Sequence, residues 1–374
     1  MPHSILDTVL LRKEDKEKQE FHPLDVVQLL LKSLTVKEAD IVRRRFGLWD
    51  KEKETLEMIG ALYNVTRERI RQIENQSIQK MKNSSEFLDT MRPVEHLIVS
   101  LIGNHGGVMT EEMLFDSLLP LTDETKQNRR ALLFILSQLL NDKIDRISEL
   151  KKYRVGWKLK LASLEFIDTT IHELTTLIRS MAKPQQFEDL FKAFQETAFY
   201  RQNAQKLNDD ALVSFMHVSM LIAKNPFDEY GLSEWGLILP KRMNDRIYLV
   251  LKKSEKPMHF TDIAERISKV FKKKAYPPTV HNELILNERY VLVGRGIYAL
   301  AEWGFKEGIV ARVIVEVLQK KGKPLSRTDI VAEVLKQRIV KKNTIHLALT
   351  NKELFSKTAE GLYTLASNLV TVSK

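Results

Sequence analysis

Cysteine is absent from this sequence of 374 residues. The chain therefore forms no disulfide bond and no metal site with thiolate ligands, and such a composition is typical of a reducing cytosol. Long hydrophobic stretches are also missing. The longest apolar run, Val26 to Leu31, is far shorter than the roughly 20 residues that cross a bilayer. No signal-peptide pattern follows Met1, so we expect a cytoplasmic protein with no membrane partner.

Motifs of the common enzyme classes are missing too. The sequence has no Walker-type glycine loop, no His-Glu-x-x-His pair, no G-x-S-x-G element and no carboxylate cluster with metal-binding spacing. His281 and His346 are candidate ligands by residue type, but they stand at matching positions of a repeat described below, which shared helix geometry explains. We therefore predict no enzyme activity, no catalytic residue, no metal site, no cofactor and no small-molecule substrate.

Length and charge indicate several domains. A chain of 374 residues is long enough for two or more domains, and a hydrophobic content of 43% is ample for their cores. The formal net charge of +10 is unevenly distributed, since residues 241–374 contain 26 Lys and Arg against 13 Asp and Glu. A basic region of this kind favours contact with nucleic acid.

Two short helical patterns follow one another between residues 55 and 82. Thr55 precedes apolar residues at every third position (Leu56, Ile59, Leu62), which predicts a capped helix whose free amides bind a phosphate. Thr66 restarts the pattern as a second cap. The second helix turns Ile70, Ile73 and Ser77 inward and leaves a polar set outside: Arg67, Glu68, Arg69, Arg71 and Gln72. Two such helices joined by a tight turn predict a helix-turn-helix.

The polar side of the second helix has the composition of a DNA-recognition helix. Arg, Glu and Gln match the edges of guanine, cytosine and adenine, and here they occupy the first two turns, the part that enters a major groove. The alternative is a solvated amphipathic helix whose Arg and Glu side chains form local ion pairs. The residue pattern alone leaves both open.

The order LT-x-x-E-A-x-I-x-x-x-RFGL, TLE-x-IG and VTRERIRQIE within Leu34 to Lys82 strongly resembles region four of bacterial primary sigma factors, the sigma-70 family. The resemblance implies binding of a minus thirty-five promoter element and docking on the β flap of RNA polymerase. It implies base contacts from Arg67, Glu68 and Gln72, and phosphate contacts from a second set: Arg45, Arg69, Arg71 and the helix start at Thr55. Thr66, the cap of the second helix, is also predicted to bind DNA.

Two departures from the family pattern concern charge. Asn75-Gln76 stands where the family usually has Ala-Lys, and Gln79 replaces a usual basic residue. Both changes remove positive charge and put the DNA affinity of this region by itself in doubt. The resemblance covers about fifty residues, so we expect a sigma-like reader attached to other domains.

The remaining chain is repetitive. A Pro precedes an Asp by five residues at Pro184, Pro257 and Pro324, and the units end in Tyr-x-Leu followed by Ser or Ala, twice continuing as Glu-Trp-Gly. Three copies are clear, and Gly107 with Trp157-Lys-Leu159 indicates a fainter fourth. In each copy we expect three helices, the second capped at Thr261 or Thr328 and the third beginning near Pro278 or Asn343, then a hairpin around Gly294-Arg295-Gly296.

Three helices and a hairpin describe a winged helix. The central copy, MHFTDIAERI through VGRGIYALAEWG, resembles the HARE-HTH family, which includes the RNA polymerase delta subunit and restriction-associated and chromatin proteins. We therefore predict a mainly α protein with a sigma region four helix-turn-helix and three or four tandem winged helices. The predicted domains are a charged N-terminal segment and five modules: 1–22, 23–90, 91–164, 165–240, 241–304 and 305–374.

Basic residues precede the third helix in the last two copies. Lys269 and Lys272 to Lys274 stand before one helix, and Lys336, Arg338, Lys341 and Lys342 stand before the next, which suggests one basic surface, with Arg295 at the hairpin tip. The alternatives are solvated loops or winged helices that bind protein. In the acidic middle section, Phe187, Phe191, Phe194 and Phe199 fall at helical spacing, and we expect core positions.

Together these patterns predict a DNA-binding transcription factor of the bacterial cytoplasm and nucleoid, with double-stranded DNA and the RNA polymerase β flap as partners. Two alternatives stay open: an accessory RNA polymerase subunit resembling delta, which acts through protein contacts, and a DNA-defence or chromatin-associated binding protein.

Overall fold

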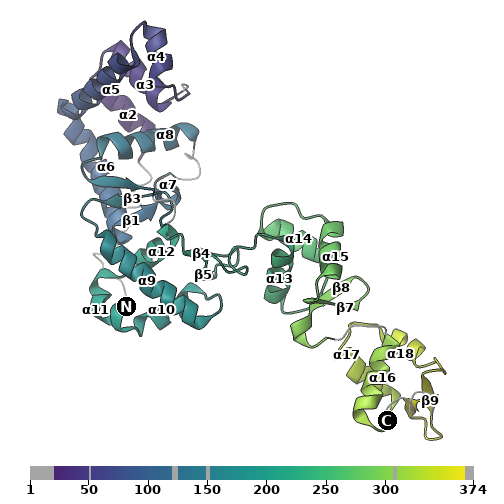
Figure 1. Ribbon diagram of the computed structural model, residues 1–374. Coiled ribbons are helices and arrows are strands. Elements are labelled where there is room, and N and C mark those ends of the chain that lie inside the picture. The colour runs from purple at the N-terminus through teal and green to yellow at the C-terminus, as the bar shows by residue number, and fades with distance from the viewer. Residues whose placement is uncertain (1–20, 50–51, 120–124, 149–151, 306–309, 367–374) are drawn as a thin grey trace. The chain divides into compact units, whose positions relative to one another are not determined.

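The computed structural model describes residues 21–49, 52–119, 125–148, 152–305 and 310–366 (Figure 1). The fold is mainly helical with small antiparallel sheets. The chain divides into two compact units, the first made of residues 1–223 and 229–233 and the second of residues 224–228 and 234–374. The charged run from Arg12 to Glu20, and with it most of the predicted N-terminal segment, lies outside the described residues.

The first unit begins with four helices that we call the helix-turn-helix region (residues 21–83): α2 (Pro23–Leu31), α3 (Val36–Phe46), α4 (Leu56–Tyr63) and α5 (Arg67–Lys82). A capping box starts α3, because the Thr35 side chain accepts from the backbone N–H of Glu38 while the Glu38 carboxylate accepts from that of Thr35 at 2.8 Å. This hydrogen bond and Lys80 lower the pKa of Glu38. Gly47 ends α3 in the left-handed region at φ 64°.

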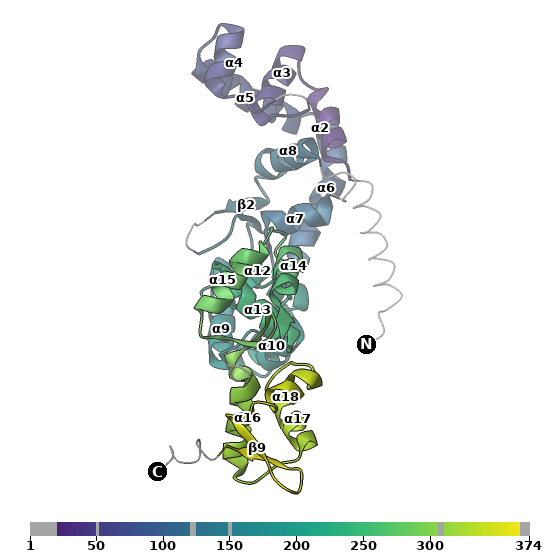
Figure 2. The same ribbon diagram turned by 90° about the vertical axis from the view of Figure 1, so that its right-hand side faces the viewer.

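Segment I (residues 85–160) follows without a break. It contains α6 (Ser85–Asn104), β1 (Val108–Thr110), α7 (Glu111–Leu118), α8 (Lys126–Phe134), a π-helical turn (Ile135–Leu139), β2 (Ile144–Ile147) and β3 (Gly156–Leu159), with the strands in the order β1-β3-β2. One apolar core extends from Phe21 through α2 and α5 to Trp157, and α8 lies against α2 (Figures 1 and 2).

This shared core corrects one predicted boundary. The division between residues 90 and 91 falls inside α6, whose buried residues, such as Met91 and Ile98, belong to the same core as Val27 and Leu30 of α2. Because a core side chain is stabilised by neighbours on every side, the helix-turn-helix region and segment I are one packed body.

Segment II (residues 164–233) contains α9 (Leu164–Met181), α10 (Phe187–Gln195), α11 (Ala198–Asn203), a 3₁₀ turn (Ala204–Lys206), α12 (Asp209–Val218), β4 (Ile222–Lys224) and β5 (Tyr230–Leu232). The two strands pair, and an isolated bridge joins Gln185 to Tyr230. Of the four predicted core phenylalanines only Phe194 is fully buried. Phe187 and Phe191 are half-buried and stack with ring centroids 5.7 Å apart, so the expectation of a core position was wrong for them.

The last helix of segment II, α12, docks on segment I. Ser214 donates to the carbonyl of Val108 in β1, and Asn208 Nδ2 donates to the Asn104 carbonyl at 3.0 Å. Arg154, just before β3, donates to three carbonyl oxygens around the end of α12: those of His217 and Ser219, both at 2.6 Å, and of Ile222 at 3.1 Å. Burial lowers the pKa of Arg154.

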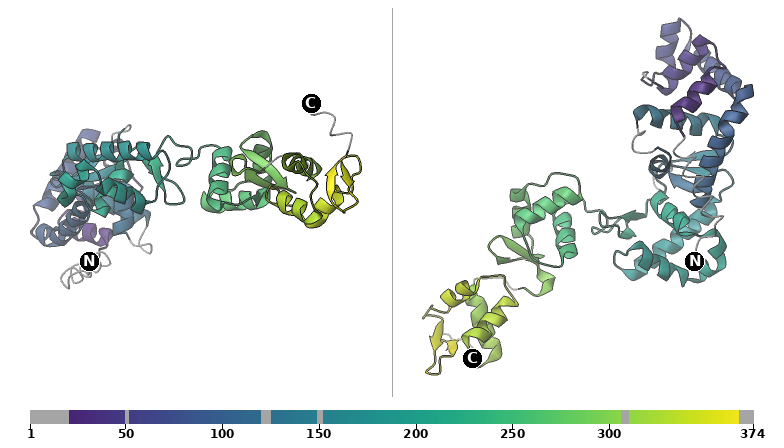
Figure 3. Two further views of the ribbon diagram at one scale, coloured as in Figure 1. Left: turned by 90° about the horizontal axis from the view of Figure 1, so that it is seen from below. Right: turned by 180° about the vertical axis from the view of Figure 1, so that it is seen from behind.

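The second unit contains segments III and IV, seen from two further sides in Figure 3. Segment III (residues 243–304) has α13 (Met243–Ser254), β6 (Met258–His259), α14 (Phe260–Val270), α15 (Pro277–Leu286), β7 (Tyr290–Gly294), β8 (Ile297–Leu300) and a 3₁₀ turn (Ala301–Trp303), with strand order β6-β8-β7. Segment IV (residues 310–366) has α16 (Val310–Lys321), α17 (Arg327–Leu335), α18 (Lys342–Ala348), β9 (Phe355–Lys357) and β10 (Tyr363–Leu365).

One element order recurs in the four segments: a helix, an extended stretch, two further helices and a hairpin whose second strand pairs with that stretch. Segment II adds the short helix α11 between the two further helices. In segments I and III the stretch is a strand, and in segments II and IV it is reduced to a bridge, Gln185 to Tyr230 and Leu325 to Tyr363. The hairpin around Arg295 is present as predicted. The predicted caps Thr261 and Thr328 were wrong, because His259 and Ser326 occupy the N-cap positions and accept the first backbone N–H bonds.

Within the described ranges no helix is both long and apolar enough to cross a membrane.

Candidate nucleic-acid interface

The predicted helix-turn-helix is formed by α4 and α5, and its turn depends on Gly60. Asn64 ends α4 in the left-handed region at φ 54°, and the Val65 N–H donates to the Gly60 carbonyl at 3.0 Å. The chain returns so close to α4 that a Cβ at Gly60 would lie 2.7 Å from the Val65 carbonyl oxygen. Only glycine allows this approach without a shift of the backbone.

Both predicted threonine caps are confirmed. The Thr55 hydroxyl accepts from the Met58 N–H and the Thr66 hydroxyl from the Arg69 N–H, each at 3.2 Å. These caps leave other N–H groups of the two first turns without intrahelical partners, as at any helix start, and such a start favours anions. Each helix start therefore has the geometry that a DNA phosphate requires.

The inner side of α5 is apolar and its outer side is polar. Ile70 is fully buried against Ile41 of α3 and Ile59 of α4, with Ile73 and Leu56 at the edge of this small core. The outer side exposes the whole predicted set: Arg67, Glu68, Arg69, Arg71 and Gln72. Since α4 and α5 share a core, the exposed side chains project from a helix that is held firmly in place.

Two of the three predicted base readers, Glu68 and Gln72, pair with predicted phosphate contacts across one turn of α5. Arg71 donates to the Glu68 carboxylate at 2.7 to 3.2 Å, and Arg69 Nη1 donates to Gln72 Oε1 at 3.1 Å. The Arg71 hydrogen bond lowers the pKa of Glu68 and raises that of Arg71. Exposed pairs of this kind contribute little to stability, so the side chains can exchange partners for base edges at small cost.

Arg45, a predicted phosphate contact, is engaged within the protein. Its Nε donates to Glu74 of α5 at 3.3 Å, and its Nη1 donates to the Glu54 carbonyl at 3.4 Å. Arg45 therefore ties α3 to α5 and to the residue before the Thr55 cap. The role in phosphate binding stays a prediction that requires this side chain to change partners.

Sequence reasoning missed a neighbouring polar network. Arg44 donates to Asp40 at 2.6 Å and to Glu54 at 2.8 Å, and the Tyr63 hydroxyl at the end of α4 donates to the same Asp40 oxygen at 2.6 Å. Burial and Asp40 raise the pKa of Tyr63. The network joins α3, α4 and the loop between them. The only sequence signal was a charged set at helical spacing, which does not specify the partners.

The second predicted set of DNA contacts lies in segment III. Lys272, Lys273 and Lys274 are exposed in the turn that leads into α15, and Lys272 has a left-handed backbone with φ 49°. The Lys274 ammonium lies 4.9 Å from the centre of the Tyr276 ring. Arg295 is exposed in the β7–β8 turn.

Segment IV contributes a smaller basic set than the sequence indicated. Lys341 and Lys342 are exposed at the start of α18. Lys336 is paired with Glu333 at 3.0 Å, and Arg338 is only 7% exposed. The assignment of Arg338 to the basic surface was therefore wrong. The turn between α17 and α18 carries the residue inward, a placement that the residue types did not reveal.

Part of this chain is similar to known proteins. Residues 30–83 match the family model described as Sigma-70, region 4. The RNA polymerase sigma factor SigA of Nostoc sp. is 44% identical over 73 residues, which are 20% of this chain and 16% of that protein. SigA1 of Synechococcus elongatus is 50% identical over 54 residues, 14% of each protein.

The chain thus spans about a sixth or less of the length of these curated relatives. The region 4 match contains α3, α4 and α5 with both threonine caps, Gly60 and all five exposed polar residues of α5. Segments I to IV lie outside it. Across the described residues, no group of three or more His, Asp and Glu side chains has the arrangement of a metal site.

Proposed function

We propose that this protein is a DNA-binding transcription regulator whose helix α5 reads a promoter element of the minus thirty-five type. The observation that carries the proposal is the construction of the α4–α5 pair: a polar set of base-matching side chains on the first two turns of a helix fixed by a closed turn at Gly60. The region 4 match and the sigma factor relatives support the same reading. Binding rather than catalysis is then the activity.

We infer further that segments I to IV are winged helices. Their common element order and hairpin position support this. The strand order of segments I and III supports it too, because the second strand of the hairpin lies between the first strand of the segment and the first strand of the hairpin. In this reading the helix just before the hairpin of each segment, α8, α12, α15 or α18, stands where a winged helix contacts a DNA groove.

Two of these four helices, α8 and α12, contact other parts of the same chain. The N-terminal part of α8 faces the helix-turn-helix region, where Arg130 donates to the Gly47 carbonyl at 3.0 Å and to Glu52 at 2.6 Å, and Lys126 donates to Glu52 at 2.8 Å. Helix α12 begins with Asp209 and Asp210 and is docked on β1. Segments I and II are therefore proposed to be structural, and additional DNA contacts are assigned to Lys272, Lys273, Lys274 and Arg295 of segment III and to Lys341 and Lys342 of segment IV.

A second candidate is an accessory subunit of RNA polymerase that acts mainly by protein contacts. The docking of α8 and α12 within the chain favours it, because winged helices used in this way need no DNA. A partner does not dock through the apolar side of the helix-turn-helix region, because that side of α2 and α5 is buried in the core shared with segment I. A polymerase contact, including one to the β flap, would use other faces.

The test is selection from a random duplex library by the purified full chain at two salt concentrations, followed by sequencing of the retained DNA. We expect an enriched motif that loses preference at defined positions with Arg67→Ala and with Gln72→Ala, because a base contact is worth about 1–3 kcal/mol of discrimination. Leu161→Ala, at a side chain 99% exposed between segments I and II, serves as the control. Retained DNA with no enriched motif, or a motif unchanged in both α5 variants, would exclude promoter reading by α5.

A further inference from the structure

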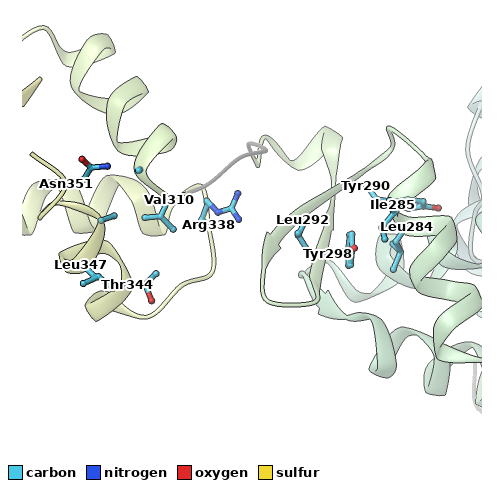
Figure 4. A pocket seen from close by; sticks show the side chains of 12 residues that line it. Leu284, Ile285, Tyr290, Leu292, Tyr298, Val310, Arg338, Thr344, Leu347 and Asn351 are labelled. Atoms are coloured by element: carbon cyan, nitrogen blue, oxygen red, sulfur yellow. The ribbon is translucent and has the colours of Figure 1, made fainter. Parts of the chain in front are cut away.

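An apolar groove of about 870 Å³ lies within the second unit, between segments III and IV. Segment III lines it with side chains of α15, β7 and β8, and segment IV lines it with side chains of α16 and α18 (Figure 4). Ile285, Leu292 and Tyr298 lie on one side, and Val310, Thr344 and Leu347 on the other. The volume lies in the range of sites that hold compact ligands or peptide side chains, roughly 300–1,000 Å³.

A backbone contact joins the two sides of the groove. The Ile339 N–H, in the turn before α18, donates to the Val293 carbonyl of β7 at 3.0 Å. Strand β7 is the edge of its sheet, so no further strand lies on its outer side to pair with its backbone. A Cβ at Gly294 would lie 2.7 Å from the Ile339 carbonyl oxygen, so the close approach requires glycine there. The groove is therefore formed by a specific contact at the strand edge.

The walls expose large apolar side chains. Leu347 of α18 is 72% exposed, Ile285 of α15 is 61% exposed, and Leu292 of β7 is 44% exposed. Leu286, beside the groove in sequence, is 82% exposed. Large exposed apolar side chains that line one groove mark an interaction site. Unlike α5, the third helices α15 and α18 direct apolar residues at this space.

The charged groups at the groove are basic. Arg338 is the charged residue among the described lining residues. Lys341, the N-cap of α18, and Lys342, its first residue, are exposed just before Thr344. The described lining includes no Asp or Glu. Basic side chains around an apolar centre complement a ligand that has apolar residues flanked by carboxylates, and the same charges disfavour a basic ligand.

We propose that this groove binds a short segment of a partner protein that carries apolar and acidic side chains. Apolar side chains of the partner fill the space between Ile285 and Leu347, in the manner of an amphipathic helix or strand laid in a groove. Carboxylates of the partner face Lys341 and Lys342, the two lysines that the proposed function also assigns to DNA, so the partner and DNA compete for them. This inference is independent of promoter reading by α5, since it uses no residue of the helix-turn-helix region.

The experiment is selection of a random peptide display library on the immobilised full chain. Parallel selections use the wild type, Leu347→Asp, Ile285→Asp, the double variant Lys341→Glu with Lys342→Glu, and Leu161→Asp as an exposed leucine outside the groove. Thermal unfolding of each variant checks that the fold is kept. We expect it to be kept, because the replaced side chains are exposed. Selected peptides are then synthesised and titrated by fluorescence anisotropy.

We expect enriched peptides that combine leucine or aromatic residues with Asp or Glu. Leu347→Asp and Ile285→Asp should weaken their binding at least tenfold, Lys341→Glu with Lys342→Glu should weaken it and increase the preference for basic peptides, and Leu161→Asp should have no effect. Enrichment that is the same for wild type and groove variants, enrichment of basic peptides by the wild type, or no enrichment at all would overturn the proposal.

Two further measurements separate other occupants. If a second copy of the chain fills the groove, sedimentation will show a concentration-dependent dimer that Leu347→Asp abolishes. If DNA fills it, Leu347→Asp will weaken binding of random duplex DNA as strongly as Lys272→Ala with Lys273→Ala does. Either result would also overturn the proposal, and neither depends on the motif that α5 selects.

Discussion

At the scale of single residues, the helix-turn-helix separates side chains that hold the fold from side chains that are available to a ligand. Ile70, Ile59 and Gly60 fix the angle between α4 and α5, while Arg67 and Gln72 are exposed. Replacing an exposed reader should therefore alter recognition without altering stability, and replacing Gly60 should alter both.

Gly60→Ala tests the closed turn. The added Cβ would clash with the Val65 carbonyl oxygen at 2.7 Å, and relief by a backbone shift should cost about 1–3 kcal/mol of unfolding free energy. The matched control is Gly103→Ala near the end of α6, where the nearest atom is a Leu159 methyl carbon at 3.9 Å. There alanine should stabilise by up to about 1 kcal/mol through helix propensity. Urea unfolding checks both, and equal effects would contradict the steric account.

At the scale of elements, the helix that precedes the hairpin makes different contacts in each segment. Helix α8 packs on α2, α12 packs on β1, and α15 and α18 line a groove. The difference follows from the residues that each helix exposes. Arg130 of α8 donates hydrogen bonds to the helix-turn-helix region, whereas the apolar side chain of Leu347 of α18 stays exposed. Similar element order therefore does not imply similar binding.

Arg154→Ala tests the docking of α12 on segment I. The guanidinium satisfies carbonyls at the end of α12 that have no helical partner, including those of His217 and Ser219 at 2.6 Å. Loss of a charged hydrogen-bond donor there should cost roughly 1.5–3 kcal/mol. Hydrogen exchange should speed up in α12 and the β1 region, with little change in α13 to α15. Arg201→Ala, at an exposed arginine of α11, should leave exchange unchanged, and a matching effect there would remove the special role of Arg154.

At the scale of the whole molecule, the excess basic charge and the proposed sequence-reading groups are separated along the chain. The polar readers of α5 are in the first unit, and residues 241–374 carry an excess of 13 basic over acidic residues, 26 against 13. Two weak DNA contacts on one chain raise the effective concentration of the second once the first is made. If both contacts form as proposed, this linkage offsets the basic residues that Gln76 and Gln79 replace.

Lys272→Ala with Lys273→Ala tests the proposed basic contact. If both side chains neutralise phosphates, affinity should fall for all DNA sequences, and the slope of log K against log salt should become shallower by about 2. The motif selected by α5 should stay the same. Lys183→Ala with Lys192→Ala removes the same charge from exposed positions of segment II and should change the slope less. Equal changes in the two double variants would indicate a general charge effect.

The sequence by itself determined the features that depend on local chemistry. Thr55 and Thr66 as caps, Ile70 as an inward position and the hairpin around Arg295 all follow from residue type and spacing, because a cap, a helical period and a glycine turn are decided within a few residues. The exposure of the α5 readers follows from the same periodicity.

Only the tertiary structure decided what these local elements contact. The core that joins α2 to α8, the burial of Arg338, the use of Arg45 between α3 and α5, and the cap at His259 in place of Thr261 depend on residues far apart in the chain or on the exact entry of a helix. The groove between α15 and α18 likewise has residues from two repeats. Spacing along a chain records which side of a helix is apolar, but the partner of that side is selected by packing across distances that spacing does not encode.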